Sequence, residues 1–234
     1  MNKPQVIYNF LKRIEPYVNA GTLQPYECLA IGLEVDPNTE MYDRLRMQLA
    51  NNIYDVVDFI RVDQPSIDYS WQQDLIDLIS YNSLDIKSFY STARSLYPDI
   101  QSHMYSQSII WNSINNKSVS LTIDDITDLK SKTSSLIDTV LANNSLDDSV
   151  RFFIVKKLRK IIEALDYYHI FGNDGLLEVL EESIGHTFTN QKYENFMRSK
   201  DSQDWKEYLG GFALGLGLTD SIISITSTIH GLLP

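Results

Sequence analysis

Glycine and proline are absent from long stretches of the sequence. No glycine lies between Gly32 and Gly172, and no proline lies between Pro98 and Pro234. A β-rich chain needs turn residues about every 8–12 positions, whereas stretches without glycine and proline permit long helices. The sequence therefore predicts an all-α fold, a multi-helix bundle that ends in a hydrophobic or amphipathic C-terminal helix.

The N-terminal half carries apolar residues at the spacing of helix faces. Helices are predicted over residues 4–19, 25–33 and 37–65, and each begins with a proline, which suits a first helical turn. Pro98 is expected to separate two further helices, because a proline inside a helix removes a backbone hydrogen bond.

The C-terminal half has its own start and stop signals. One helix is predicted over residues 145–171, where Gly172 ends it, and another over 173–185. The polar loop 115–120 is the best candidate boundary. The chain is therefore expected to divide into helical regions 1–115 and 121–200 and a C-terminal segment, 201–234, for membrane insertion or oligomerisation.

Composition and motifs restrict the function. The chain has 234 residues and a net charge of −11 at pH 7, which argues against general binding to DNA or RNA. The single cysteine, Cys28, fits a reducing cytoplasm and cannot form a cysteine-based zinc site. The histidines are not spaced to chelate a metal, and no phosphate-binding loop, dinucleotide-binding or serine-hydrolase motif is present. We therefore expect no enzyme, catalytic residue, metal or cofactor.

The segment 151–160 is strongly basic for this acidic chain. It contains no acidic residue and five cations: Arg151, Lys156, Lys157, Arg159 and Lys160. On a helix, Lys156, Arg159 and Lys160 share one face. Two interpretations stay open: a solvated face that pairs with acidic helices, or a binding site for a nucleotide phosphate or an acidic partner.

The tail 208–234 is nearly free of charge. Residues 208–229 would reach about 33 Å as a helix, enough for a bilayer. Gly211 and Gly215 would allow helices to pack closely. One face of the predicted helix is apolar, and the other carries the residue types that line a pore, namely Asp220, Ser224 and Ser227.

Asp220 decides between two interpretations of this tail. An aspartate at the centre of a membrane helix costs about 2.5–3.5 kcal/mol, so a monomeric membrane anchor is disfavoured. An oligomer that places Asp220 in a shared polar lumen would remove much of that cost. The alternative is a C-terminal helix buried in a subunit interface of a soluble protein.

The C-terminal part also resembles a known group of proteins. Segments Leu158–Gly172 and Gly175–Gly185 resemble a helical pattern of bacterial proteins that are encoded in phage-defence loci. Together with the polar-striped tail, residues 145–234 resemble the membrane effectors of nucleotide-signalled defence systems, including the channel-forming effector of the Hailong type. The resemblance implies a homo-oligomeric channel that stays closed until a nucleotide or oligonucleotide messenger binds.

Two functional hypotheses follow. The first is a self-associating anti-phage defence effector, cytoplasmic or at the inner membrane, that forms a pore through lipid. A nucleotide or oligonucleotide messenger bound at the basic segment would open this pore. The second is a soluble all-helical adaptor, similar to an antitoxin, whose C-terminal helix is buried in an interface and whose acidic surface faces a basic partner.

Overall fold

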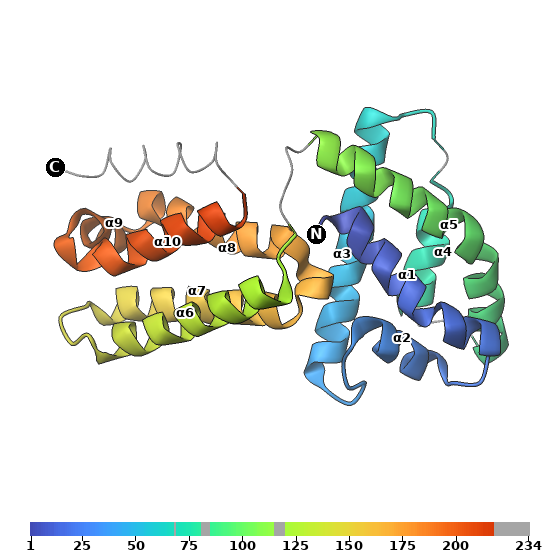
Figure 1. Cartoon of the computed structure of the whole chain (residues 1–234), viewed down its shortest axis with the longest axis horizontal. Helices are drawn as coiled ribbons and strands as arrows, with labels where there is room; N and C mark the ends of the chain where they lie inside the picture. Colours follow the sequence, from blue (N-terminus) through green and yellow to red (C-terminus); the bar gives the residue numbers. More distant parts are fainter. Residues whose placement is uncertain (68, 81–84, 115–119, 218–234) are drawn as a thin grey trace. The chain divides into compact units, whose positions relative to one another are not determined.

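The computed structural model describes residues 1–67, 69–80, 85–114 and 120–217. Within these ranges the chain is helical and contains no strand, which confirms the predicted all-α class (Figure 1). The chain forms two compact units. Residues Asn2–Asn116 form the N-terminal unit, and residues Lys117–Pro234 with Met1 form the C-terminal unit.

Five helices make up the described part of the N-terminal unit. They are α1 (Lys3–Ala20), α2 (Pro25–Leu33), α3 (Glu40–Asp63), α4 (Trp71–Ser80) and α5 (Ile86–Ile114). Helix α1 packs against α2, α3 and α5, and α4 packs against α3 and α5. The side chains that face inward include fully buried aromatic and aliphatic residues, among them Phe10, Ile14, Leu45, Leu49 and Phe89.

Gly32 sets the approach of α2 to α1. A Cβ at this position would lie 2.4 Å from Ile14 and 2.5 Å from Phe10. Only a residue without a side chain permits this spacing, so a glycine is required here for packing rather than for a turn.

Helix α5 continues through position 98, so the prediction that Pro98 separates two helices is wrong. A proline within a helix costs about 3 kcal/mol, because it removes one backbone hydrogen bond and crowds the preceding turn. The packing of α5 against α1 and α4 offsets this local cost.

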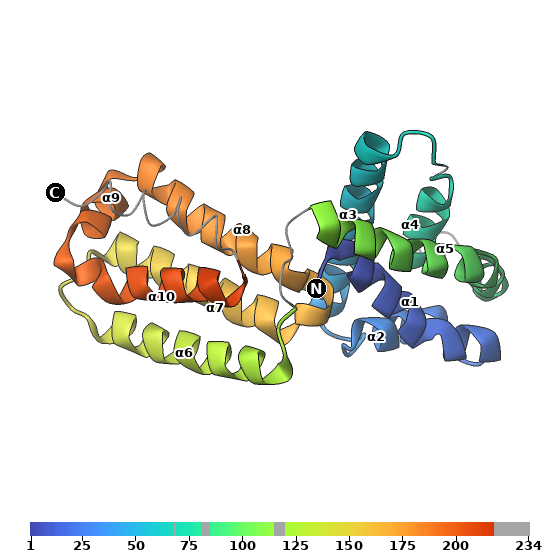
Figure 2. The ribbon, with the colours of Figure 1, turned by 45° about the horizontal axis from the view of Figure 1, so that its top comes forward.

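The C-terminal unit contains α6 (Ile123–Ala142), α7 (Asp148–Asp166), α8 (Tyr168–Thr189), α9 (Gln191–Arg198), a 3₁₀ turn η1 (Lys200–Ser202) and α10 (Gln203–Gly215). Helices α6 and α7 lie side by side, α7 also packs against α8 and α9, and α10 packs against α6 and α8 (Figures 1 and 2). Helix α6 begins at a capping box, in which Thr122 and Asp125 satisfy each other's backbone N–H groups.

The predicted boundaries around Gly172 are partly wrong. Gly172 adopts φ 60° and ψ −159°, so the helical conformation is broken there, as predicted. However, α7 already ends at Asp166, and α8 passes Gly185 and continues to Thr189. Gly185 is helical and exposed, and a solvated glycine in a helix weakens the helix without ending it.

The prediction of a membrane pore or ion channel is wrong, because none of the described helices is long and apolar enough to cross a bilayer. Helix α10, with which the predicted span begins, ends at Gly215 after 13 residues. Leu209, Phe212 and Leu216 are buried in the core of their own unit. The predicted pore residues Asp220, Ser224 and Ser227 lie outside the described residues.

Candidate functional site

The structure places the five cations of segment 151–160 on α7 and gives them different roles. The guanidinium of Arg151 donates to the carboxylate of Asp148 at 2.8 Å. It also donates to the backbone carbonyl oxygens of Asn143 at 2.8 Å and Leu146 at 3.2 Å. Arg151 therefore holds the loop between α6 and α7 through its two terminal nitrogens, whereas its Nε is buried without a partner in the described structure.

Lys157 and Lys160 hold α7 against α8. The ammonium of Lys157, a side chain only 9% exposed, pairs with the Glu182 carboxylate and lies 5.2 Å from the centre of the Phe153 ring. Lys160 contacts the same carboxylate at 3.2 Å. The hydrogen bond from Lys157 lowers the pKa of Glu182 below its usual range. These two cations thus match the interpretation of a face that pairs with an acidic helix.

Lys156 and Arg159 differ from the other three cations. Both are exposed, and neither makes an ion pair or a side-chain hydrogen bond with a residue that the structure describes. Both line a surface hollow of about 360 Å³, together with Phe152, Val155, Lys160 and Glu163. Phe152 is 71% exposed, although it is a large apolar side chain. We call Phe152, Lys156 and Arg159 the α7 surface.

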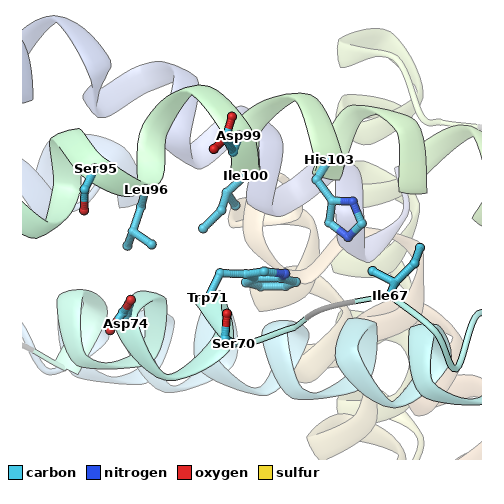
Figure 3. A pocket seen from close by; sticks show the side chains of 9 residues that line it. All are labelled: Ile67, Ser70, Trp71, Asp74, Ser95, Leu96, Asp99, Ile100 and His103. Atoms are coloured by element: carbon cyan, nitrogen blue, oxygen red, sulfur yellow. The ribbon is translucent and has the colours of Figure 1, made fainter.

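A second candidate site lies in the N-terminal unit. A cavity of about 480 Å³ opens between the start of α4 and the middle of α5 (Figure 3). Its lining residues are Ile67, Ser70, Trp71, Asp74, Ser95, Leu96, Asp99, Ile100 and His103. We call it the Trp71–His103 cavity, because these two rings meet edge to face at its wall, with ring centres 5.9 Å apart.

Two polar atoms in this wall are buried without a partner. They are Nε1 of Trp71 and Nε2 of His103, and neither makes a hydrogen bond within the described structure. An unsatisfied buried donor or acceptor costs about 1–3 kcal/mol. Burial also lowers the pKa of the His103 imidazole, which favours its neutral form. Because most buried polar groups in proteins are hydrogen-bonded, these two atoms distinguish this wall from the rest of the unit's surface.

No pattern in the sequence predicts this cavity. Trp71 and His103 lie on different helices and are far apart in the sequence, and neither belongs to a motif. One local feature does point toward it. His103 follows Asp99 by four residues, so on a helix the imidazole and the carboxylate lie on neighbouring turns, close to the apolar side chain of Ile100.

The glycines predicted for helix packing lie on α10. Gly211 and Gly215 are exposed, and a Cβ at either position would meet no described atom within 4 Å. Their role in self-association stays a prediction. Among the residues described, no group of three His, Cys, Asp or Glu side chains could hold a metal ion.

The chain was compared with protein families, curated proteins and solved structures. No protein-family description, no curated protein and no solved structure matches the chain. The resemblance of residues 145–234 to Hailong-type effectors therefore stays a prediction.

Proposed function

We propose that the protein is a helical interaction module that binds an acidic segment of a partner protein through the α7 surface. The observation that carries this proposal is Phe152, 71% exposed, beside two cations, Lys156 and Arg159, that make no ion pair with a described residue. This is the adaptor alternative of the sequence analysis, with a different partner charge.

The combination of side chains favours protein binding over mere solvation. Aromatic and arginine side chains are enriched at interface cores, and they supply most of the energy when a partner buries them. Phe152 offers apolar area, and Arg159 offers a planar group that can bind a carboxylate with two hydrogen bonds. A single exposed phenylalanine is common on protein surfaces and needs no explanation. Here, however, it lies beside two cations that have no ion-pair partner in the described structure.

The charge of the chain indicates the kind of partner. Acidic residues outnumber basic ones by 11, yet Lys156 and Arg159 have no carboxylate paired to them in the described structure. A complementary segment would carry carboxylates around an apolar anchor. The field of the whole molecule opposes its approach, so the attraction must come from short-range contacts.

A charge-reversal experiment tests the proposal. The probe is a short synthetic peptide of glutamate, aspartate and leucine, and its binding is measured by isothermal titration calorimetry. The double variant Lys156→Glu with Arg159→Glu should bind it about tenfold more weakly or not at all. Phe152→Ser should weaken binding with little change in the free energy of unfolding, because this side chain is exposed.

The control is a double variant with the same net charge. Lys132→Glu with Lys200→Glu reverses two exposed cations that do not line the hollow. Equal affinity of the two double variants, or no binding of the peptide to the unmodified protein, would contradict the proposal. Tight binding of pyrophosphate in place of the peptide would contradict it as well, because the α7 surface would then serve a small anion. The mass of the protein in solution, measured in parallel, tests the predicted self-association.

A further inference from the structure

We propose that the Trp71–His103 cavity is a binding site for a small organic cation with an apolar body. The cavity belongs to the N-terminal unit alone, and its lining is visible in Figure 3. The proposal rests on two observations: apolar side chains around the Trp71 ring, and two exposed carboxylates in the same lining.

The apolar side chains that line the cavity indicate that the ligand has an apolar body. Leu96 and Ile100 extend from α5 toward α4, where Trp71 lies below Ile100, and Ile67 lies below His103 (Figure 3). The volume of about 480 Å³ falls in the range of small-molecule sites, which extends from about 300 to 1,000 Å³. An aromatic ring or a short alkyl chain could fill this apolar part of the cavity and leave the opening to a polar group.

Two carboxylates in the lining indicate that the ligand is positively charged. Asp74 on α4 and Asp99 on α5 both line the cavity and are exposed. Neither pairs with a described cation, so both carboxylates are available to a bound ammonium or guanidinium. The Trp71 ring adds the attraction of an aromatic face for a cation. An anionic ligand would meet two carboxylates at the opening as well as the field of an acidic chain.

The two unpartnered atoms are buried beneath the cavity surface, so a ligand would reach them only after a shift of the Trp71 or His103 ring. Nε1 of Trp71 carries a hydrogen and can only donate, whereas Nε2 of a neutral His103 can accept or donate, depending on the tautomer. An ammonium or guanidinium group on an apolar stem is found both in free amines and in the lysine or arginine side chains of a partner protein.

Three compounds with one shared body test the charge preference. Phenethylamine is a cation, 2-phenylethanol is neutral and phenylacetate is an anion, and each is titrated into the full chain by calorimetry. We expect phenethylamine to bind at least about tenfold more tightly than 2-phenylethanol, and phenylacetate to bind most weakly. No measurable binding of phenethylamine, or tighter binding of phenylacetate, would overturn the proposal.

Substitutions at the opening locate the site. Asp74→Asn with Asp99→Asn should weaken phenethylamine binding about tenfold or more. Both residues are exposed, so these variants should stay folded, which circular dichroism can verify. The control variant Asp58→Asn with Asp77→Asn removes the same charge from α3 and α4 at positions that do not line the cavity. Equal losses in the two double variants would overturn the site, because net charge alone would then explain the effect.

A second arm distinguishes the two sources of the cation. Capped lysine and arginine dipeptides are compared with phenethylamine on the same protein. Tighter binding of a dipeptide indicates a partner side chain, and tighter binding of phenethylamine indicates a free amine. The α7 surface can be tested separately. The variant Lys156→Glu with Arg159→Glu changes no residue that lines the cavity, so it should bind phenethylamine as tightly as the unmodified protein does.

Discussion

At the scale of the residue, the pair of Lys157 and Glu182 should contribute measurably to stability. Glu182→Gln leaves the nearly buried ammonium of Lys157 without a carboxylate, so it should lower the free energy of unfolding by about 1–3 kcal/mol. Urea denaturation at pH 7 measures this loss. Lys160→Gln is the matched control, because Lys160 contacts the same carboxylate from an exposed position, and its loss should be below about 1 kcal/mol.

The pH dependence of the same pair has a defined sign. The pKa of Glu182 is lower in the folded protein than its ordinary value of 4.5, because Lys157 donates to its charged form. The stabilisation is therefore complete above about pH 4.5 and is lost as the pH falls through the folded pKa. The difference in stability between the unmodified protein and Glu182→Gln should narrow as the pH falls from 7 toward 3. A constant difference over that range would show that the charge of Glu182 is not the cause.

Single residues also show how far the sequence could predict the candidate sites. The basic segment was identifiable because five cations stand without an acid. The separate roles of these cations could not be predicted, because Glu182 lies on the next helix and only packing brings it to Lys157. The Trp71–His103 cavity depends in the same way on the pairing of α4 with α5, which no local pattern encodes.

At the scale of the element, Gly172 and Gly185 of α8 should respond to alanine in opposite directions. Gly172 combines a positive φ with an extended ψ, a conformation essentially restricted to glycine, so Gly172→Ala should destabilise the protein by about 1–3 kcal/mol. Gly185 is exposed and helical, and a Cβ there meets no described atom within 4 Å. Gly185→Ala should therefore stabilise the protein by about 0.5–1 kcal/mol. Urea denaturation of both variants checks this, and destabilisation by Gly185→Ala would show that the helix is not formed there.

Element boundaries were predictable where the signal is local and not where packing decides. The first two predicted helices, over 4–19 and 25–33, match α1 and α2 to within a residue, because a proline starts each and apolar residues face one side. Pro98 and Gly185 are also local signals, yet α5 and α8 continue through them. Packing along the rest of each long helix compensates for the local penalty, which is about 3 kcal/mol for the proline and about 1 kcal/mol for the glycine.

At the scale of the whole molecule, the start of the tail shows why an apolar segment alone does not predict a membrane span. Residues 208–216 lack charge because Leu209, Phe212 and Leu216 pack into the core of the C-terminal unit. Tyr208 adds a hydrogen bond of 2.7 Å between its hydroxyl and that of Thr133 on α6. Helix α10 is apolar because it packs against α6 and α8. A helix in lipid would have a similar composition, so composition alone does not distinguish a protein core from a bilayer.

The division into two units predicts two unfolding transitions that respond to different substitutions. Each unit buries its own set of apolar side chains, which include Leu49 in the N-terminal unit and Leu158 in the C-terminal unit, both 0% exposed. Trp205 reports on the C-terminal unit, and Trp111, in contact with Phe59, reports on the N-terminal unit.

Leu158→Ala should lower the stability reported by Trp205 by about 2–5 kcal/mol, the usual cost of a cavity in a core, and leave the signal of Trp111 nearly unchanged. Leu49→Ala should do the reverse. Urea denaturation followed by fluorescence, in backgrounds where only one unit keeps its tryptophans, measures both effects. If each substitution shifted both signals equally, the chain would unfold as a single cooperative body, and the two cores would depend on each other for stability.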